Sequence, residues 1–205
     1  MPSTTVDALR PLYAFLDPHG GKATAKSARL KKVSSQSAIV VGGRDARNYY
    51  ILDAWNARCS TDDLVEKMFE LHAQWRLRTM GIEENGLVPL FQGAVMREAK
   101  WRGTPLPLLG VPQNTHVEKT YRIRTRLQTI IGHGRLIVAE PLTELVKQIT
   151  RFPLDPQMDL VDACASLIDL MPSRPAPVER NREREAKLKY LRNRGVDPQV
   201  IAKYA

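Results

Sequence analysis

The chain has 205 residues, with 31 lysines and arginines against 22 aspartates and glutamates, which gives a net charge of +9. This length can bury a full hydrophobic core, and the basic balance favours a polyanionic partner such as nucleic acid over a charge that serves solubility alone. Cys59 and Cys164 are the only cysteines, and both fall in predicted structured segments, which argues against a disulfide framework or a zinc site.

No apolar stretch approaches the length of a membrane span, and Asp7 and Arg10 interrupt any N-terminal hydrophobic region. Taken together with the cysteine content, these features predict a chain that works in a reducing, cytoplasmic-type compartment.

Three short apolar runs near the N-terminus predict strands over residues 12–16, 38–41 and 49–52. A polar loop rich in lysine separates the first two runs, and Gly42 and Gly43 mark a turn after the second. Strands this close in sequence pair most simply as antiparallel hairpins.

A helix is predicted from Thr61 to about Leu77, capped by Ser60 or Thr61, with apolar residues at three- and four-residue steps. The strand that ends at Glu83 follows it, so this helix is a crossover and the strand should run parallel to its neighbour.

The remaining core elements alternate between helical and extended segments. Helices are predicted over residues 88–99, 119–131, 142–152 and 159–171, with a proline-bounded extended passage around 108–111 and a short apolar run at 136–138. This order indicates an α/β fold, a mixed sheet with helices on its faces, as one domain over residues 1–171. Residues 172–205 are predicted to be a proline linker and a basic helical tail, either a solvated helix held by ion pairs or an arm that binds DNA or a partner.

Three acids far apart in sequence each stand where a hydrophobic element begins or ends: Asp17, Glu83 and Asp159. Carboxylates in such places suit a hard divalent cation such as Mg²⁺, and hydrolysis of a phosphodiester by two ions needs several of them. Asp162 follows Asp159 by three residues, so one helical face could present both. Each acid alone could instead start a turn, lie on the surface or favour a helix N-terminus.

The order and spacing of these segments resemble the nuclease domain of the large terminase subunit of tailed bacteriophages, a member of the ribonuclease H-like superfamily. The segments that carry the resemblance are residues 15–18, 37–42, 50–53, 82–86, 119–123, 152–153 and 158–163. The resemblance implies a ribonuclease H-like mixed sheet, with three antiparallel strands and then parallel strands, flanked by helices.

The resemblance also implies a metal site for two Mg²⁺ or Mn²⁺ ions. Asp17 matches the ligand of the first strand, Glu83 that of the crossover strand and Asp159 the acid at the start of the final helix, with Asp162 as a further ligand. Glu84 is the reserve for Glu83, because neighbours on a strand face opposite sides and only one can point inward. The chain departs from many relatives at Met158, where they carry an aspartate.

By this resemblance the chain is expected to be a metal-dependent endonuclease that cuts concatemeric viral double-stranded DNA during genome packaging in the host cytoplasm. The residues expected to grip DNA phosphates are Lys22, Lys26, Lys31, Lys32, Lys119, Arg122 and Arg124. The expected partners are the small terminase subunit, the portal and a separate ATPase domain, since the stretch 20–24 lacks the spacing of a phosphate-binding ATP loop.

Two alternatives stay open at this point. One is another ribonuclease H-like nuclease, acting on DNA junctions or RNA–DNA hybrids, and the other is a non-catalytic DNA-binding module of the packaging machinery. Trp101, beside Lys100 and Arg102, either contacts DNA or folds onto the domain.

Overall fold

The computed structural model describes residues 6–18, 36–84, 88–112 and 117–172. The compact unit Met1–Arg44 and Asn48–Met171 contains all of the described helices and strands. The predicted phosphate-gripping lysines at positions 22, 26, 31 and 32 lie outside the described residues, and so does the predicted tail apart from Pro172. Those assignments, and the domain boundary at residue 171, therefore stay predictions.

A single six-stranded sheet runs through the described residues, in the order β5-β4-β1-β2-β3-β6. Its strands are β1 (Tyr13–Asp17), β2 (Ser37–Arg44), β3 (Tyr49–Ala57), β4 (Thr79–Glu83), β5 (Leu108–Val111) and β6 (Leu136–Val138). β1, β2 and β3 pair antiparallel in sequence order, whereas β4 lies parallel to β1, β5 to β4 and β6 to β3. The predicted mixed sheet, with an antiparallel start and parallel additions, is confirmed.

The segment Leu108–Val111 is a strand, where the sequence predicted only an extended passage. It pairs in parallel with Met80–Glu83 of β4. Its prolines explain why it stays short and occupies an edge of the sheet: Pro107 and Pro112 flank it and have no N–H to contribute to a ladder.

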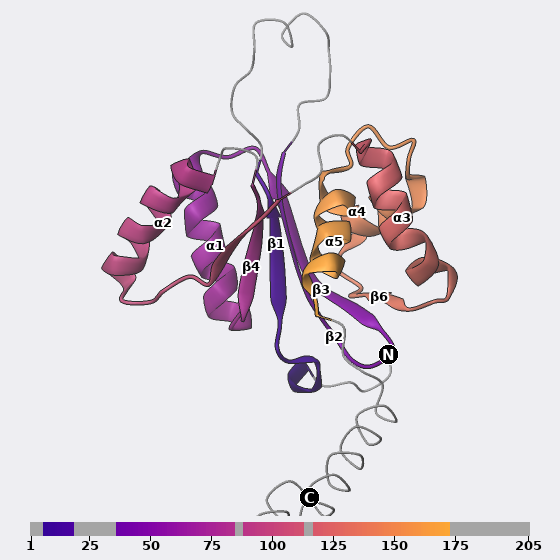
Figure 1. Ribbon diagram of the computed structural model, residues 1–205, viewed down its shortest axis with the longest axis horizontal. Helices are drawn as coiled ribbons and strands as arrows, with labels where there is room; N and C mark the ends of the chain where they lie inside the picture. Colours follow the sequence, from indigo (N-terminus) through magenta and orange to yellow (C-terminus); the bar gives the residue numbers. More distant parts are fainter. Residues whose placement is uncertain (1–5, 19–35, 85–87, 113–116, 173–205) are drawn as a thin grey trace, which may run out of the picture. The chain divides into compact units, whose positions relative to one another are not determined.

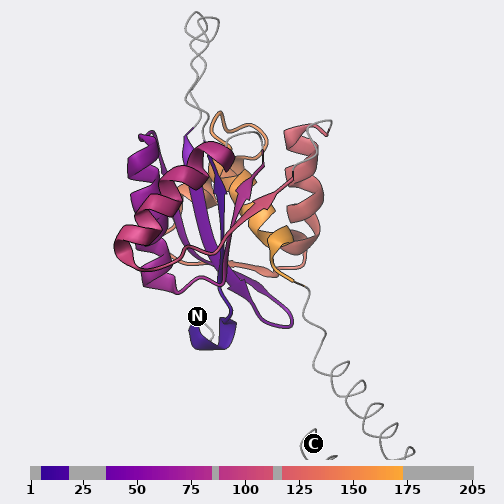
Figure 2. The same cartoon turned by 60° about the vertical axis from the view of Figure 1, so that its left-hand side comes forward.

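Helices cover both faces of the sheet, as Figures 1 and 2 show: α1 (Thr61–Trp75) and α2 (Val88–Arg102) lie on one side, and α3 (Lys119–Gly132), α4 (Thr143–Arg151) and α5 (Asp159–Leu170) on the other. A short 3-10 helix, η1 (Val6–Leu9), precedes β1. α1 ends at Trp75, two residues before the predicted end, because Arg76 adopts a left-handed conformation (φ 51°) and its N–H bonds to the carbonyl of His72.

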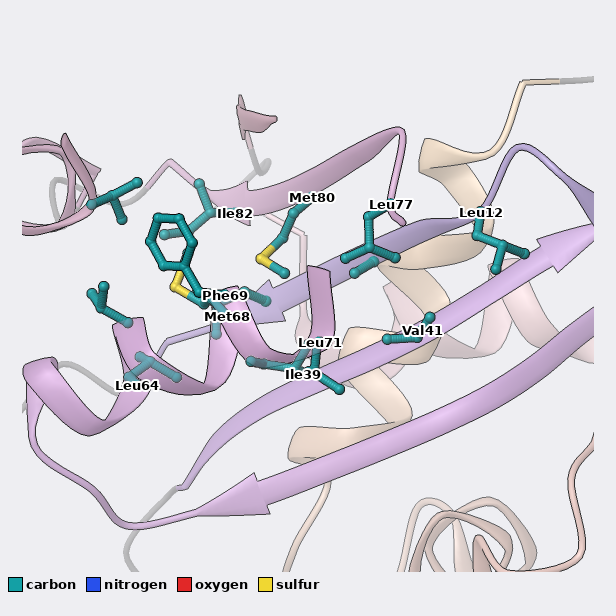
Figure 3. Close-up of a cluster of buried hydrophobic side chains, with 14 of the residues drawn as sticks. Leu12, Ile39, Val41, Leu64, Met68, Phe69, Leu71, Leu77, Met80 and Ile82 are labelled. Atoms are coloured by element: carbon teal, nitrogen blue, oxygen red, sulfur yellow. The ribbon is translucent and has the colours of Figure 1, made fainter. Parts of the chain in front are cut away.

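The core is divided by the sheet into two apolar clusters. In the cluster on the α1 side, Met68 and Leu71 of α1 lie over Ile39 and Met80 of the sheet (Figure 3). The cluster on the other side is built around α5, which is buried along almost its whole length. Because α5 packs directly on the central strands β1, β2 and β3, its N-terminus is held at a fixed place against the sheet.

Candidate functional site

The alternation of side chains along β1 and β4 decides which acids share a face. Ala14 and Leu16 of β1 belong to the cluster on the α1 side, whereas Tyr13 and Phe15 belong to the cluster around α5. Side chains alternate between the two faces along a strand, so Asp17, two residues after Phe15, points to the α5 side. On β4, Met80 and Ile82 pack on the α1 side, so Glu83 points to the α5 side as well.

The parallel pairing of β1 with β4 then makes neighbours of two distant acids. Leu16 lies beside Ile82 in the ladder, so Asp17 and Glu83 follow at adjacent strand ends. The charge of Glu83 acts on the carboxyl of Asp17. Glu84 is exposed, and its carboxyl group lies over Gly110 of the edge strand β5, 3.5 Å from where a Cβ at that position would stand. The structure therefore brings Glu83, and not its neighbour Glu84, to Asp17.

α5 contributes the other two carboxylates from its first turn. Asp159 is 8% exposed and Asp162 is 3% exposed. The backbone N–H of Gln36, at the start of β2, donates a hydrogen bond to Oδ2 of Asp159 (3.0 Å). Acids in the first turn of a helix are favoured by the positive end of its dipole, which supports both at this position.

The N-terminus of α5 is capped by a side chain from another helix. Its N-cap residue, Met158, has no side-chain oxygen, and Oε1 of Gln148 on α4 accepts the N–H groups of Leu160 (3.0 Å) and Val161 (3.3 Å) instead. Gln148 is fully buried. This glutamine satisfies two donors that the helix cannot pair internally, and it thereby fixes the turn that carries Asp159 and Asp162.

The first turn of α3 places two cations among these acids. Nζ of Lys119 lies 3.0 Å from Oδ2 of Asp162, 3.7 Å from Oδ2 of Asp17 and 3.9 Å from Oδ1 of Asp159. Nη2 of Arg122 donates to both carboxylate oxygens of Asp162 at 3.0 Å. We call these six residues, Asp17, Glu83, Lys119, Arg122, Asp159 and Asp162, the carboxylate cluster.

Burial and the neighbouring charges together set the electrostatics of the carboxylate cluster. Burial raises the pKa of Asp17 to about 8; Lys119 counteracts this, while Asp162, Glu83 and Asp159 raise it further. Burial by itself would lower the pKa of Lys119, but the negative charges of Asp162, Asp17 and Asp159 outweigh burial and raise it. The cluster thus holds four carboxyl groups against two cationic side chains, and the raised pKa of Asp17 leaves that carboxyl protonated near neutral pH.

The donor chemistry of the carboxylate cluster fits a hard divalent cation. All four acids offer carboxylate oxygens, the ligands that Mg²⁺ and Mn²⁺ prefer, and neither histidine nor cysteine belongs to the cluster. Within the residues that the structure describes, no group of three or more acidic, histidine or cysteine side chains is already close enough together to hold a metal ion. Lys119 lies among the acids, with its Nζ 3.0–3.9 Å from three of them.

The predicted DNA-contacting residues divide into different environments. Lys119 and Arg122 lie inside the carboxylate cluster, whereas Arg124 is exposed on α3 and lines a cavity of about 500 Å³ with Leu127 and Phe152. The sequence did not predict the part played by Gln148. The sequence does contain an indication of this role, since Gln148 is a polar residue three positions after Leu145, on the apolar face of an amphipathic helix.

No protein-family model and no curated protein matches the sequence. The fold matches several solved structures. The nuclease domain of the human cytomegalovirus terminase aligns at a TM-score of 0.56 and 14% identity, over 78% of this chain and 83% of that one. A mutant nuclease domain of the large terminase subunit of bacterial virus Sf6, solved with manganese and β-thujaplicinol, aligns at 0.50 and 11%, over 78% and 89%.

The large terminase of a thermophilic bacteriophage aligns at a TM-score of 0.50 and 8% identity, over 82% of this chain and 44% of that one. The chain thus has the ribonuclease H-like fold of viral terminase nuclease domains, as the sequence predicted. At this level of identity the match concerns the fold.

Proposed function

We propose that this chain is a divalent-metal-dependent DNA endonuclease, in which Asp17, Glu83 and Asp159 hold Mg²⁺ or Mn²⁺. The observation that carries the proposal is that these acids, from β1, β4 and α5, gather at the same end of the central strands with Lys119 among them. The fold adds support, since similar structures are viral terminase nuclease domains and one of them was solved with manganese.

The bound cations would supply Lewis acidity toward a phosphodiester and lower the pKa of an attacking water. The chain's own residues prepare the place. Asp17 and Glu83 stand at the ends of adjacent, buried strands, and Asp159 is fixed by the N–H of Gln36, so each carboxylate is oriented before any ligand arrives. Because these carboxylates are already ordered, binding a cation would not carry the entropic cost of ordering them.

We assign different roles to Asp162 and Asp159, although both stand in the first turn of α5. Both oxygens of Asp162 accept from Arg122, and Oδ2 also lies 3.0 Å from Lys119, so most of its acceptor capacity is used within the protein. Asp162 can bind a metal ion only if the ammonium group of Lys119 moves away from its carboxylate. Lys119, once displaced from the acids, is well placed to contact a phosphate of the substrate, which keeps it in the predicted DNA-contacting set together with Arg124.

We further propose that the substrate is concatemeric viral double-stranded DNA, cut during genome packaging in the host cytoplasm. The net charge of +9 suits a duplex, and the similar structures are domains of terminases. The partners that follow from this role are a packaging ATPase, the small terminase subunit and the portal. None of the described helices is long and apolar enough to cross a bilayer.

Nicking of supercoiled plasmid tests the activity directly. The parent protein should convert plasmid to open-circular and linear forms with Mn²⁺ or Mg²⁺ and should leave it intact in EDTA. Glu83→Gln should abolish nicking, and Glu84→Gln is its matched control, because it makes the same change one residue away on the opposite face of the strand. Absence of metal-dependent nicking at every protein concentration would overturn the proposal.

Linear duplex, four-way junction and RNA–DNA hybrid, compared in the same assay, test the substrate class. Duplex DNA should be cut at least as fast as the other two. A strong preference for the junction or the hybrid would still support nuclease activity, but it would contradict the proposed role in genome packaging.

A further inference from the structure

The outer face of α2 exposes two large hydrophobic side chains. Met96 is 71% exposed and Trp101 is 80% exposed. Residues three and four apart are neighbours on a helix, so Met96 lies beside Lys100, and Arg97 beside Trp101. Gly93 is exposed on the same side. We call these five residues, Gly93, Met96, Arg97, Lys100 and Trp101, the α2 face (α2 comes forward in Figure 2).

Trp101 stands outward because its inner side is already occupied. The guanidinium of Arg102 lies over the Trp101 ring, 5.8 Å from its centroid, and over the Phe69 ring at 5.2 Å. Two acids hold that guanidinium in place, Glu98 at 2.6 Å and Glu66 of α1. One side of the indole therefore contacts a cation that two acids hold, and the other side is open to a partner.

The charge of the α2 face indicates its partner. Its two ionisable residues, Arg97 and Lys100, are both cationic, whereas the acids nearby, Glu98 and the exposed Glu66, are each paired with Arg102. An exposed aromatic ring with cations nearby is an arrangement that binds single-stranded nucleic acid, because a base stacks on the ring while the cations contact its phosphates. In a duplex the bases are already stacked on each other and offer no free face to an indole.

We propose that the α2 face is a binding site for unpaired DNA, separate from the carboxylate cluster. One base stacks on the open face of Trp101, Met96 adds apolar contact, and Arg97 and Lys100 contact the neighbouring phosphates. The proposal does not depend on cleavage by this chain, since it concerns binding alone.

Fluorescence anisotropy with a labelled oligothymidine tests the proposal, in EDTA so that cleavage plays no part. Trp101→Ala should weaken binding of the single strand by about tenfold, as expected when one base–aromatic stack is removed. Trp101→Phe keeps a ring and should restore most of that affinity. Binding of a duplex of the same length should change by less than about twofold in either variant, because its bases do not reach the indole.

The matched control is Leu154→Ala. Leu154 is also a large exposed hydrophobic residue, with 89% of its surface accessible, but it lies in the loop after α4. It should bind the single strand as the parent does. Arg97→Ala with Lys100→Ala should flatten the salt dependence of single-strand binding by about 0.7 for each phosphate that the variant no longer neutralises.

If Trp101→Ala binds oligothymidine as tightly as the parent does while its thermal unfolding is unchanged, the proposal is wrong. An equal weakening for duplex and single strand in that variant would also overturn it, because stacking on an unpaired base would not be the interaction removed. The nicking assay with Glu83→Gln reports separately on the proposed nuclease, so either conclusion can fail alone.

Discussion

Replacing Gln148 with methionine should destabilise the protein by roughly 2–6 kcal/mol, because two buried N–H groups lose their acceptor and each such group costs about 1–3 kcal/mol. The change keeps the length of the side chain and removes the oxygen that accepts the N–H groups of Leu160 and Val161. Gln148 is fully buried, so water cannot replace that oxygen. Its Nε2 has no hydrogen-bond partner among the described residues, so removing the amide's other end breaks no further bond there.

Urea denaturation followed by circular dichroism measures the effect as a lower midpoint with an unchanged slope. Gln128→Met is the control, since Gln128 is exposed on α3 and the same chemical change there should cost less than about 0.5 kcal/mol. A destabilisation below about 0.5 kcal/mol for Gln148→Met would refute the capping role.

The remaining predictions concern charge and packing. In EDTA, the stability of the parent should fall as pH rises from about 4 to 8, because folded Asp17, with its pKa raised to about 8, keeps a proton that the unfolded chain releases. Asp17→Asn should remove that slope and add up to about 5 kcal/mol at pH 8 in urea denaturation. Arg122→Met should cost about 3–5 kcal/mol in the same measurement by leaving the buried Asp162 with one cation fewer. Gly81→Val should cost about 3 kcal/mol or more, seen as a lower midpoint of thermal unfolding, because even a Cβ there would lie 2.8 Å from the Phe15 ring.

The sheet could be predicted from the sequence because it depends on local patterns, and so could the places of the three separated acids at the ends of its elements; their role as metal ligands stays a prediction. β-branched and apolar runs mark the strands, and the helix between the third strand and Glu83 requires a parallel return. The acids that end β1 and β4 therefore lie side by side, at the same end of these adjacent strands. The choice between Glu83 and Glu84 needed the structure, since it depends on which face of β4 packs against α5.

The cations and the cap of the carboxylate cluster could not be predicted in the same way. Lys119 was expected to face DNA from a basic helix, but its position among the acids depends on how α3 packs against α5. Gln148 caps a helix that begins eleven residues later in the chain, so no local capping motif contains it. The strand β5 was obscured in the sequence by its prolines and forms because β4 offers it an edge.

A crystal of the protein soaked in Mn²⁺ tests the central claim most directly, because manganese scatters anomalously and can be located without assumption. We predict an anomalous peak coordinated by Asp17, with Glu83 and Asp159 as further ligands, and Nζ of Lys119 moved away from the acids. An ordered carboxylate cluster with no manganese, and with Lys119 still 3.7 Å from Asp17, would contradict the account.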